Sequence, residues 1–88
     1  MINTMVRATY TCSWEEIQKR ITDDMNGEPG QWIGEWSLLR EGDNGMVWLG
    51  EIKNFDAFGA FMSDPAEMEK DKSMGIDYKA YSIQPMDA

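Results

Sequence analysis

The sequence of 88 residues contains no histidine and one cysteine, and it has sixteen acidic residues against eight basic ones. Without histidine the chain cannot form a histidine-ligated haem site, use an imidazole as a general base or build an ordinary zinc site. One cysteine excludes a disulfide within the chain, so nothing ties the protein to an oxidising compartment. We therefore expect neither a metal nor a cofactor.

Long apolar runs are also absent. The longest span a few residues, such as Met46 to Leu49, whereas about 20 apolar residues are needed to cross a bilayer. The N-terminal residues have neither the basic nor the apolar region of a secretory signal. The net charge of −8 gives no general attraction to nucleic acid or to an anionic membrane. We expect a cytoplasmic protein that binds neither.

The composition that remains is typical of a globular protein, because 42% of the residues are hydrophobic and 27% are charged. A chain this short cannot divide its apolar residues between two cores, so the sequence predicts one domain spanning 1–88. Four residues are tryptophans, a high number for this length.

Alternating apolar and polar residues predict four strands. The predicted strands are 5–12, 31–41, 46–53 and 77–84, with a hairpin turn at 41–45. In 31–41 the alternation places Trp32, Trp36 and Leu38 on one face, opposite Ile33 and Leu39. Strand 46–53 is apolar on both faces, which is typical of a strand in the middle of a covered sheet.

Capping signals predict the helices. Ser13 and Glu16 form a capping box, and the helix that they begin carries apolar residues at helical spacing until Gly27. A second helical region begins at Asn54 or Asp56 and ends near Ser73. It breaks at 63–65, because Asp64 and Pro65 are typical of a new helix start. We expect the tail 85–88 to be loose.

This order of strand, helix, two strands, helix and strand is the ferredoxin-like βαββαβ plan, an α+β fold with a four-stranded antiparallel sheet and two helices on one face. It resembles the dimeric α+β barrel superfamily, which implies that strands 5–12 and 46–53 are central. The aromatic-rich helix from Phe55 that ends at Ser63-Asp64-Pro65 is similar to the corresponding helix of antibiotic-biosynthesis-monooxygenase-like proteins. In that family a histidine often follows this break. Here Pro65-Ala66-Glu67 contains none, so haem binding is not expected.

The second face of the predicted sheet leads us to expect a homodimer. Helices cover one face, and strand 46–53 still presents Val47 and Leu49 to the other. A contiguous exposed apolar patch is uncommon on monomers, and burying it contributes about 25 cal/mol per Å² before the costs of association. The sequence predicts two sheets packed face to face about a two-fold axis.

Candidate ligand-binding residues are the aromatic and basic side chains of the predicted sheet. They are Arg7, Tyr10, Trp32, Trp36 and Trp48. The tryptophans can line a pocket for a planar apolar ligand, and the plainer interpretation is that they fill the core and the interface. A buried Arg7 needs an acceptor, either Glu35, Glu51 or an anionic ligand, although a structural ion pair is the simpler interpretation. Tyr10 can donate to a ligand or to the backbone.

Other polar groups carry weaker signals. Cys12 precedes a helix N-terminus, where the dipole lowers a thiol pKa, but no histidine is present to act as its base. The pairs Glu15-Glu16 and Asp23-Asp24 and the mixed-sign run 67–72 are typical of solvated helix faces. No catalytic residue is assigned.

Two functions follow from these patterns. The favoured one is a non-catalytic module that binds a small apolar or aromatic molecule or associates with a partner. The alternative is a cofactor-independent monooxygenase- or isomerase-like enzyme acting on a small aromatic or quinone-like substrate. An enclosed cavity lined by Trp36, Trp48 or Tyr10 together with Arg7 would favour ligand chemistry, whereas a filled core would favour a scaffold.

Overall fold

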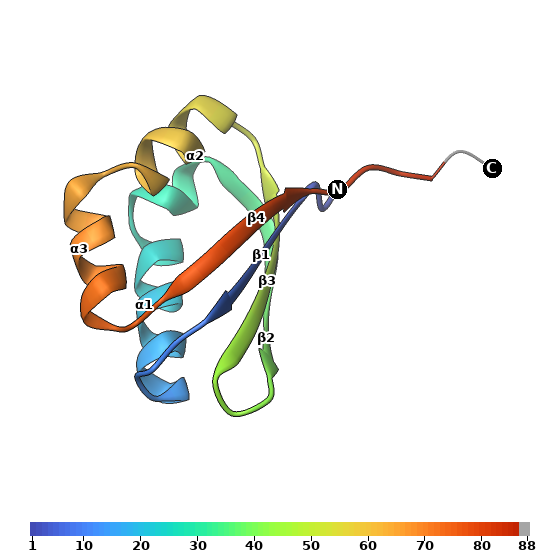
Figure 1. Ribbon diagram of the computed structural model, residues 1–88. Helices are drawn as coiled ribbons and strands as arrows, with labels where there is room; N and C mark the ends of the chain where they lie inside the picture. The colour runs from blue at the N-terminus through green and yellow to red at the C-terminus, as the bar shows by residue number, and fades with distance from the viewer. Residues whose placement is uncertain (87–88) are drawn as a thin grey trace.

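The computed structural model describes residues 1–86 and has a four-stranded antiparallel sheet with helices packed on one face (Figure 1). Its elements are β1 (Thr4–Thr9), α1 (Trp14–Asn26), the 3₁₀ helix η1 (Glu28–Gln31), β2 (Ile33–Glu41), β3 (Gly45–Ile52), α2 (Phe55–Met62), α3 (Pro65–Ser73) and β4 (Asp77–Ser82). The chain is therefore a small α+β protein. Residues 83–86 follow β4 without regular structure, and residues 87–88 of the expected loose tail lie outside the described residues.

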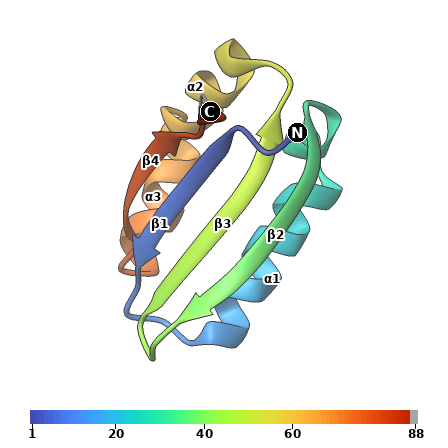
Figure 2. The ribbon, with the colours of Figure 1, turned by 90° about the vertical axis from the view of Figure 1, so that its right-hand side faces the viewer.

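The strands lie in the order β2-β3-β1-β4, and every neighbouring pair is antiparallel (Figure 2). The central positions of β1 and β3 are as predicted. Opposed residues on antiparallel strands share a face, so Val6 lies beside Trp48 on the face that the helices cover. Met5, opposite Leu49, lies on the other face, which we call the open face and which faces the viewer in Figure 2.

The local signals that begin α1 are confirmed. The Ser13 hydroxyl accepts a hydrogen bond from the Glu16 backbone N–H at 3.1 Å, and the Glu16 carboxylate accepts one from the Ser13 N–H at 3.2 Å. These two bonds satisfy backbone donors that have no partner inside the helix. Ile17, one turn into the helix, is 1% exposed, so the cap places the apolar side of α1 on the sheet.

The alternation predicted for β2 is wrong at its beginning. Ile33 pairs with Ile52, but Trp36 pairs with Gly50, so β2 has one extra residue between these pairs. Such a bulge changes which residues point to which face. As a result Ile33 joins Trp36 and Leu38 on the helix-covered face, where it is 9% exposed. Trp32 lies outside the strand, at the end of η1.

The break in the second helical region is confirmed. The Asn54 side chain accepts from the Ala57 N–H and begins α2, and Asp64 accepts from the Ala66 N–H with Pro65 at the first position of α3. The two helices differ in character, because α3 has no buried residue and its first and last turns carry charged side chains. No helix within residues 1–86 is both long and apolar enough to span a bilayer.

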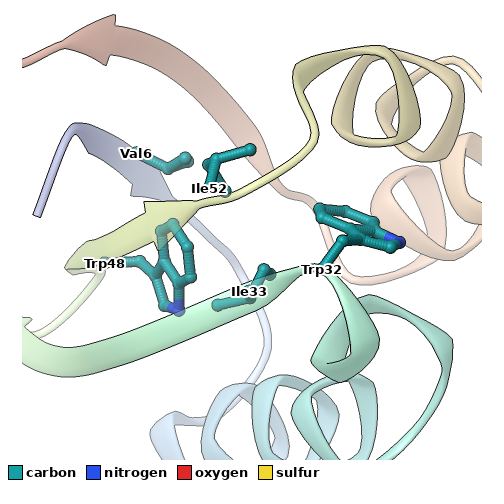
Figure 3. Close-up of a cluster of buried hydrophobic side chains, with 5 residues drawn as sticks. All are labelled: Val6, Trp32, Ile33, Trp48 and Ile52. Atoms are coloured by element: carbon teal, nitrogen blue, oxygen red, sulfur yellow. The ribbon is translucent and has the colours of Figure 1, made fainter. Parts of the chain in front are cut away.

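The core lies between the sheet and the helices. One cluster contains Val6, Trp32, Ile33, Trp48 and Ile52, and a second contains Ala8, Tyr10, Ile17 and Met46. Figure 3 shows the first cluster, with Trp32 on the side nearest the helices and the other four side chains grouped at the strands. Both faces of β3 are apolar as predicted, since Val47 and Leu49 point to the open face, where they are half-buried.

Two glycines give a matched test of this packing. A Cβ at Gly50 would lie 2.1 Å from Cη2 of Trp48, whereas a Cβ at Gly59 in α2 would have no atom within 4 Å. We predict that Gly50→Ala lowers the free energy of unfolding by about 1–3 kcal/mol through overpacking, and that Gly59→Ala raises it by about 0.5–1 kcal/mol through helix propensity. Urea unfolding measures both. A stable Gly50→Ala variant would mean that the Trp48 ring is loosely held.

Candidate functional site

The structure brings two of the five candidate residues together and separates the others. Trp32 and Trp48 are 9% and 5% exposed and border one cavity. Tyr10 is buried elsewhere, with its ring stacked on Trp14 at a centroid distance of 6.5 Å. Trp36 lies on the edge strand and is 37% exposed.

Arg7 lies on the open face and forms an ion pair, which was the simpler of its two interpretations, but with an acceptor that was not expected. Its side chain is exposed rather than buried, and its Nε donates to Glu41 Oε1 at 2.8 Å. The two acceptors expected for it instead contact the N-terminal ammonium, with Glu51 at 2.6 Å and Glu35 at 3.5 Å. Arg7 therefore forms a surface ion pair and does not border the cavity that contains the tryptophans.

The cavity has a volume of about 90 Å³ and lies between the helix-covered face of the sheet and the helices. Its apolar lining comes from every layer and includes Val6 of β1, Ile21 of α1, Trp48 of β3 and Phe58 of α2. A dry apolar cavity costs stability, because its lining loses packing contacts. This cavity is partly open and has charged as well as apolar residues in its lining, an arrangement suited to a small ligand.

Two tryptophans that border the cavity have buried N–H donors without a protein acceptor. The indole N–H groups of Trp32 and Trp48 are both buried and donate to no atom of residues 1–86. The Trp32 ring is held edge-on by Phe58 and Phe61, at centroid distances of 6.2 and 6.0 Å. In Figure 3 its nitrogen points away from the strand residues of the cluster, toward the helices. An unsatisfied buried donor costs about 1–3 kcal/mol, which a ligand acceptor would recover.

One side of the cavity is charged, and we call its four side chains the Arg20 cluster. It consists of Arg20 and Asp24 of α1 with Glu67 and Asp71 of α3. Arg20 donates through Nη2 to Glu67 at 2.9 Å and through Nη1 to Asp71. Its Nε lies 3.9 Å from Asp24 Oδ2 and has no hydrogen-bond partner in the described chain.

The Asp24 carboxyl is the most perturbed group in the Arg20 cluster. Its pKa rises from 3.8 to about 6, first because burial disfavours the carboxylate and second because Glu67 repels it, against the attraction of Arg20. Its side chain is 17% exposed. A carboxyl group that titrates near neutral pH beside an apolar cavity can hold a cation or exchange a proton with a ligand.

The sequence did not predict that the charged side chains of the Arg20 cluster lie together at a cavity. Asp23-Asp24 and the run 67–72 were predicted to be solvated, but the side chains of Glu67 and Asp71 are 13% and 21% exposed. The available signal was spacing, because Arg20 and Asp24 are four residues apart, as are Glu67 and Asp71, so each pair lies on one helix face. Nothing local showed that the two faces would meet.

The Cys12 thiol also differs from its expectation. Its pKa is raised rather than lowered, first by burial and then by the nearby Glu16 carboxylate. These effects outweigh the favourable position before the helix N-terminus. The thiol is therefore not an activated nucleophile.

Comparison with solved structures identifies the fold. No protein-family model matches the chain, and no curated protein matches it in sequence. The structure of SnoaB, a cofactor-independent oxygenase from Streptomyces nogalater, is similar with a TM-score of 0.65 at 17% identity, covering 99% of this chain and 94% of that one. A putative antibiotic biosynthesis monooxygenase from Deinococcus radiodurans gives a TM-score of 0.57 at 12% identity, covering 97% and 94%. The chain thus has the ferredoxin-like α+β fold of antibiotic-biosynthesis-monooxygenase-like proteins.

The raised pKa of Asp24 predicts a pH-dependent loss of stability. The pKa of about 6 in the folded protein exceeds the ordinary value of 3.8. The contribution of the protonated Asp24 carboxyl to the free energy of unfolding is therefore complete below pH 3.8 and is lost as the pH rises through 6. Asp24→Asn removes this loss. We expect the free energy of unfolding of the variant to exceed that of the wild type by about 1 kcal/mol at pH 7.5, a value reduced for partial solvent access. Near pH 4 the two free energies should be equal.

Urea unfolding at pH 4, 5, 6 and 7.5 measures the difference. Asp23→Asn is the matched control, because it removes the same charge from an exposed neighbour and should change stability at pH 7.5 by less than about 0.5 kcal/mol. A constant difference between Asp24→Asn and the wild type at all four pH values would contradict the assignment.

Proposed function

We propose that this protein binds a small, mostly apolar molecule in the cavity between its sheet and helices. The observation that carries the proposal is that two tryptophans bordering an apolar cavity, Trp32 and Trp48, have buried indole N–H donors to which the described chain offers no acceptor. Apolar walls with a few polar groups at fixed positions are typical of ligand sites. A core built for scaffolding alone is expected to be filled and satisfied.

The size of the cavity limits the ligand. Each water-sized group needs on the order of 10–15 Å³, so about 90 Å³ has room for roughly six to nine such groups. This corresponds to one aromatic ring with a short substituent. Pockets for larger ligands measure about 300–1,000 Å³, so a polycyclic molecule would require the helices to move.

A thermal-shift panel tests this proposal. Acetophenone has one ring and an oxygen acceptor for an indole N–H, and it should raise the melting temperature. Anthraquinone, with three fused rings, should not. At 100 times its Kd a ligand adds about 2.7 kcal/mol, which corresponds to roughly 10–20 °C for a domain of this size.

A variant that fills the cavity provides the control. Ile21→Phe adds volume at the cavity wall and should abolish the shift while the protein stays folded. Met68→Phe makes the same kind of change at an exposed position of α3 and should keep the shift. No shift with any single-ring compound, or an equal shift in the Ile21→Phe variant, would refute binding in this cavity.

A second candidate function is catalysis without a cofactor, of the monooxygenase or isomerase type. The observation that favours it is Asp24, whose carboxyl pKa of about 6 suits proton exchange with a bound substrate near neutral pH. The fold is shared with a cofactor-independent oxygenase, which by itself does not assign an activity. Chromatography with mass analysis of the bound compounds after incubation in air separates the two candidates. A binding module returns each ligand unchanged, whereas oxygenation changes the mass and isomerisation changes the retention time.

The open face supports the proposal that two copies associate through their sheets. Its apolar residues are Met5, Leu39, Val47, Leu49 and Tyr81. Leu39 and Tyr81 are 52% and 44% exposed, and the helices all lie behind the sheet in Figure 2. An apolar face of this kind is suited to a self-complementary two-fold interface.

Two charge substitutions test the association. Leu39→Glu places a carboxylate in the proposed interface and should convert a dimer into a monomer of 10.1 kDa at micromolar concentration. Phe55→Glu is the matched control, because Phe55 has a similar exposed fraction of 55% but lies on α2. Light scattering gives the mass. A monomeric wild type, or a Leu39→Glu variant that stays dimeric, would rule out this interface.

A further inference from the structure

The charges around the cavity do not balance. Arg20 is the one cation of the Arg20 cluster, and both of its Nη groups are used by Glu67 and Asp71 on α3. The Asp24 carboxylate lies 3.9 Å from the Nε of Arg20, and no donor within residues 1–86 forms a hydrogen bond with it. Lys70 lies 3.3 Å from Glu67, but its own side chain is 58% exposed and faces solvent. Asp24 is therefore a mostly buried carboxylate that shares its cation, Arg20, with two other carboxylates.

The remaining titratable groups near Asp24 do not supply a second buried cation. Those that act on it or border the same cavity are Arg20 and Asp23 on α1, Glu67, Lys70 and Asp71 on α3, and Tyr78 on β4. The pKa of Tyr78 is raised by burial and by Asp71, so its hydroxyl is neutral at pH 7. Three carboxylates thus face one buried guanidinium at the cavity.

Aromatic side chains line the same cavity. Phe58 and Phe61 stand edge-on to the ring of Trp32, and aromatic side chains pack favourably against another ring. Trp32 borders this cavity and is 9% exposed, and its buried N–H has no partner within residues 1–86, which independently supports a ligand here. An apolar cavity with aromatic side chains and an excess of carboxylates is suited to a positively charged ring compound.

We propose that the cavity selects a small aromatic amine in its protonated form, with the ring among the tryptophans and the ammonium group at Asp24. This inference rests on the proposed ligand-binding function and adds the sign of the ligand's charge. An ammonium donates hydrogen bonds to a carboxylate that lacks a donor. A ligand carboxylate would instead meet three like charges, so aromatic acids are disfavoured. A neutral ligand of the same shape is intermediate.

Three compounds that share one ring and differ in charge test this selection. They are phenethylamine, phenethyl alcohol and phenylacetate, titrated into the wild-type protein at pH 7.5 by calorimetry. We expect the amine to bind at least tenfold more tightly than the alcohol, and the acid to bind most weakly. At pH 5 the amine is still protonated but Asp24 has largely taken up its proton, so the preference for the amine over the alcohol should shrink.

Two variants show whether Asp24 is responsible. Asp24→Asn should bring the amine to within about threefold of the alcohol. Asp23→Asn removes the same charge from the same helix at an exposed position and should keep the preference, which excludes a general effect of the −8 charge. Propylamine, which has the charge without the ring, should bind far more weakly than phenethylamine.

The outcomes separate this inference from the proposed function. If the alcohol binds and the amine binds no more tightly, the cavity is a ligand site without charge selection, and the inference is wrong. The same holds if Asp23→Asn loses the preference as fully as Asp24→Asn. If phenylacetate binds best, the charge assignment is reversed. If none of the three compounds binds, both the inference and the proposed function fail.

Discussion

The guanidinium of Arg20 joins two helices that have little else in common. No residue of α3 is buried, so the helix gains little from the hydrophobic effect, which attaches most helices to a core. Its inward side chains, Glu67 and Asp71, are held by Arg20 on α1. Exposed ion pairs contribute about 0–1 kcal/mol, but losing one partner of a buried pair costs about 3–5 kcal/mol. The attachment of α3 to α1 therefore depends on a polar contact more than on apolar packing.

This polar attachment determines the chemistry of the cavity. A helix held by apolar residues would give a cavity without charges, suited to any apolar molecule of the right size. Here the two carboxylates of α3 occupy the guanidinium, and Asp24 is left undercompensated with a raised pKa. The same contact that holds α3 thus makes the cavity selective for charge. Stability and ligand preference are consequently linked through one arginine.

The sequence predicted those parts of the structure that depend on residues near each other in the chain. The cap at Ser13, the break before Pro65 and the central positions of β1 and β3 follow from local hydrogen bonding, ring geometry and apolar pattern. The bulge before Trp36 was missed because an inserted residue does not alter local alternation until the partner strand is known. Of the five candidate residues, Trp32 and Trp48 border a common cavity, since large rings in adjacent segments have few other places to pack. The Arg20 cluster was missed because it forms between helices about 50 positions apart, and spacing within each helix does not show that the two faces meet.

A carboxyl group beside an apolar cavity has two uses, and they place opposite demands on Asp24. To exchange protons with a substrate it needs a pKa near the working pH, which its present surroundings supply. To hold an ammonium group it must stay ionised, and a bound cation itself lowers the carboxyl pKa. A ligand that satisfies Asp24 by charge therefore removes its capacity to act as an acid or base. For this reason the binding and catalytic candidates are exclusive for any one ligand, although the same fold can support either.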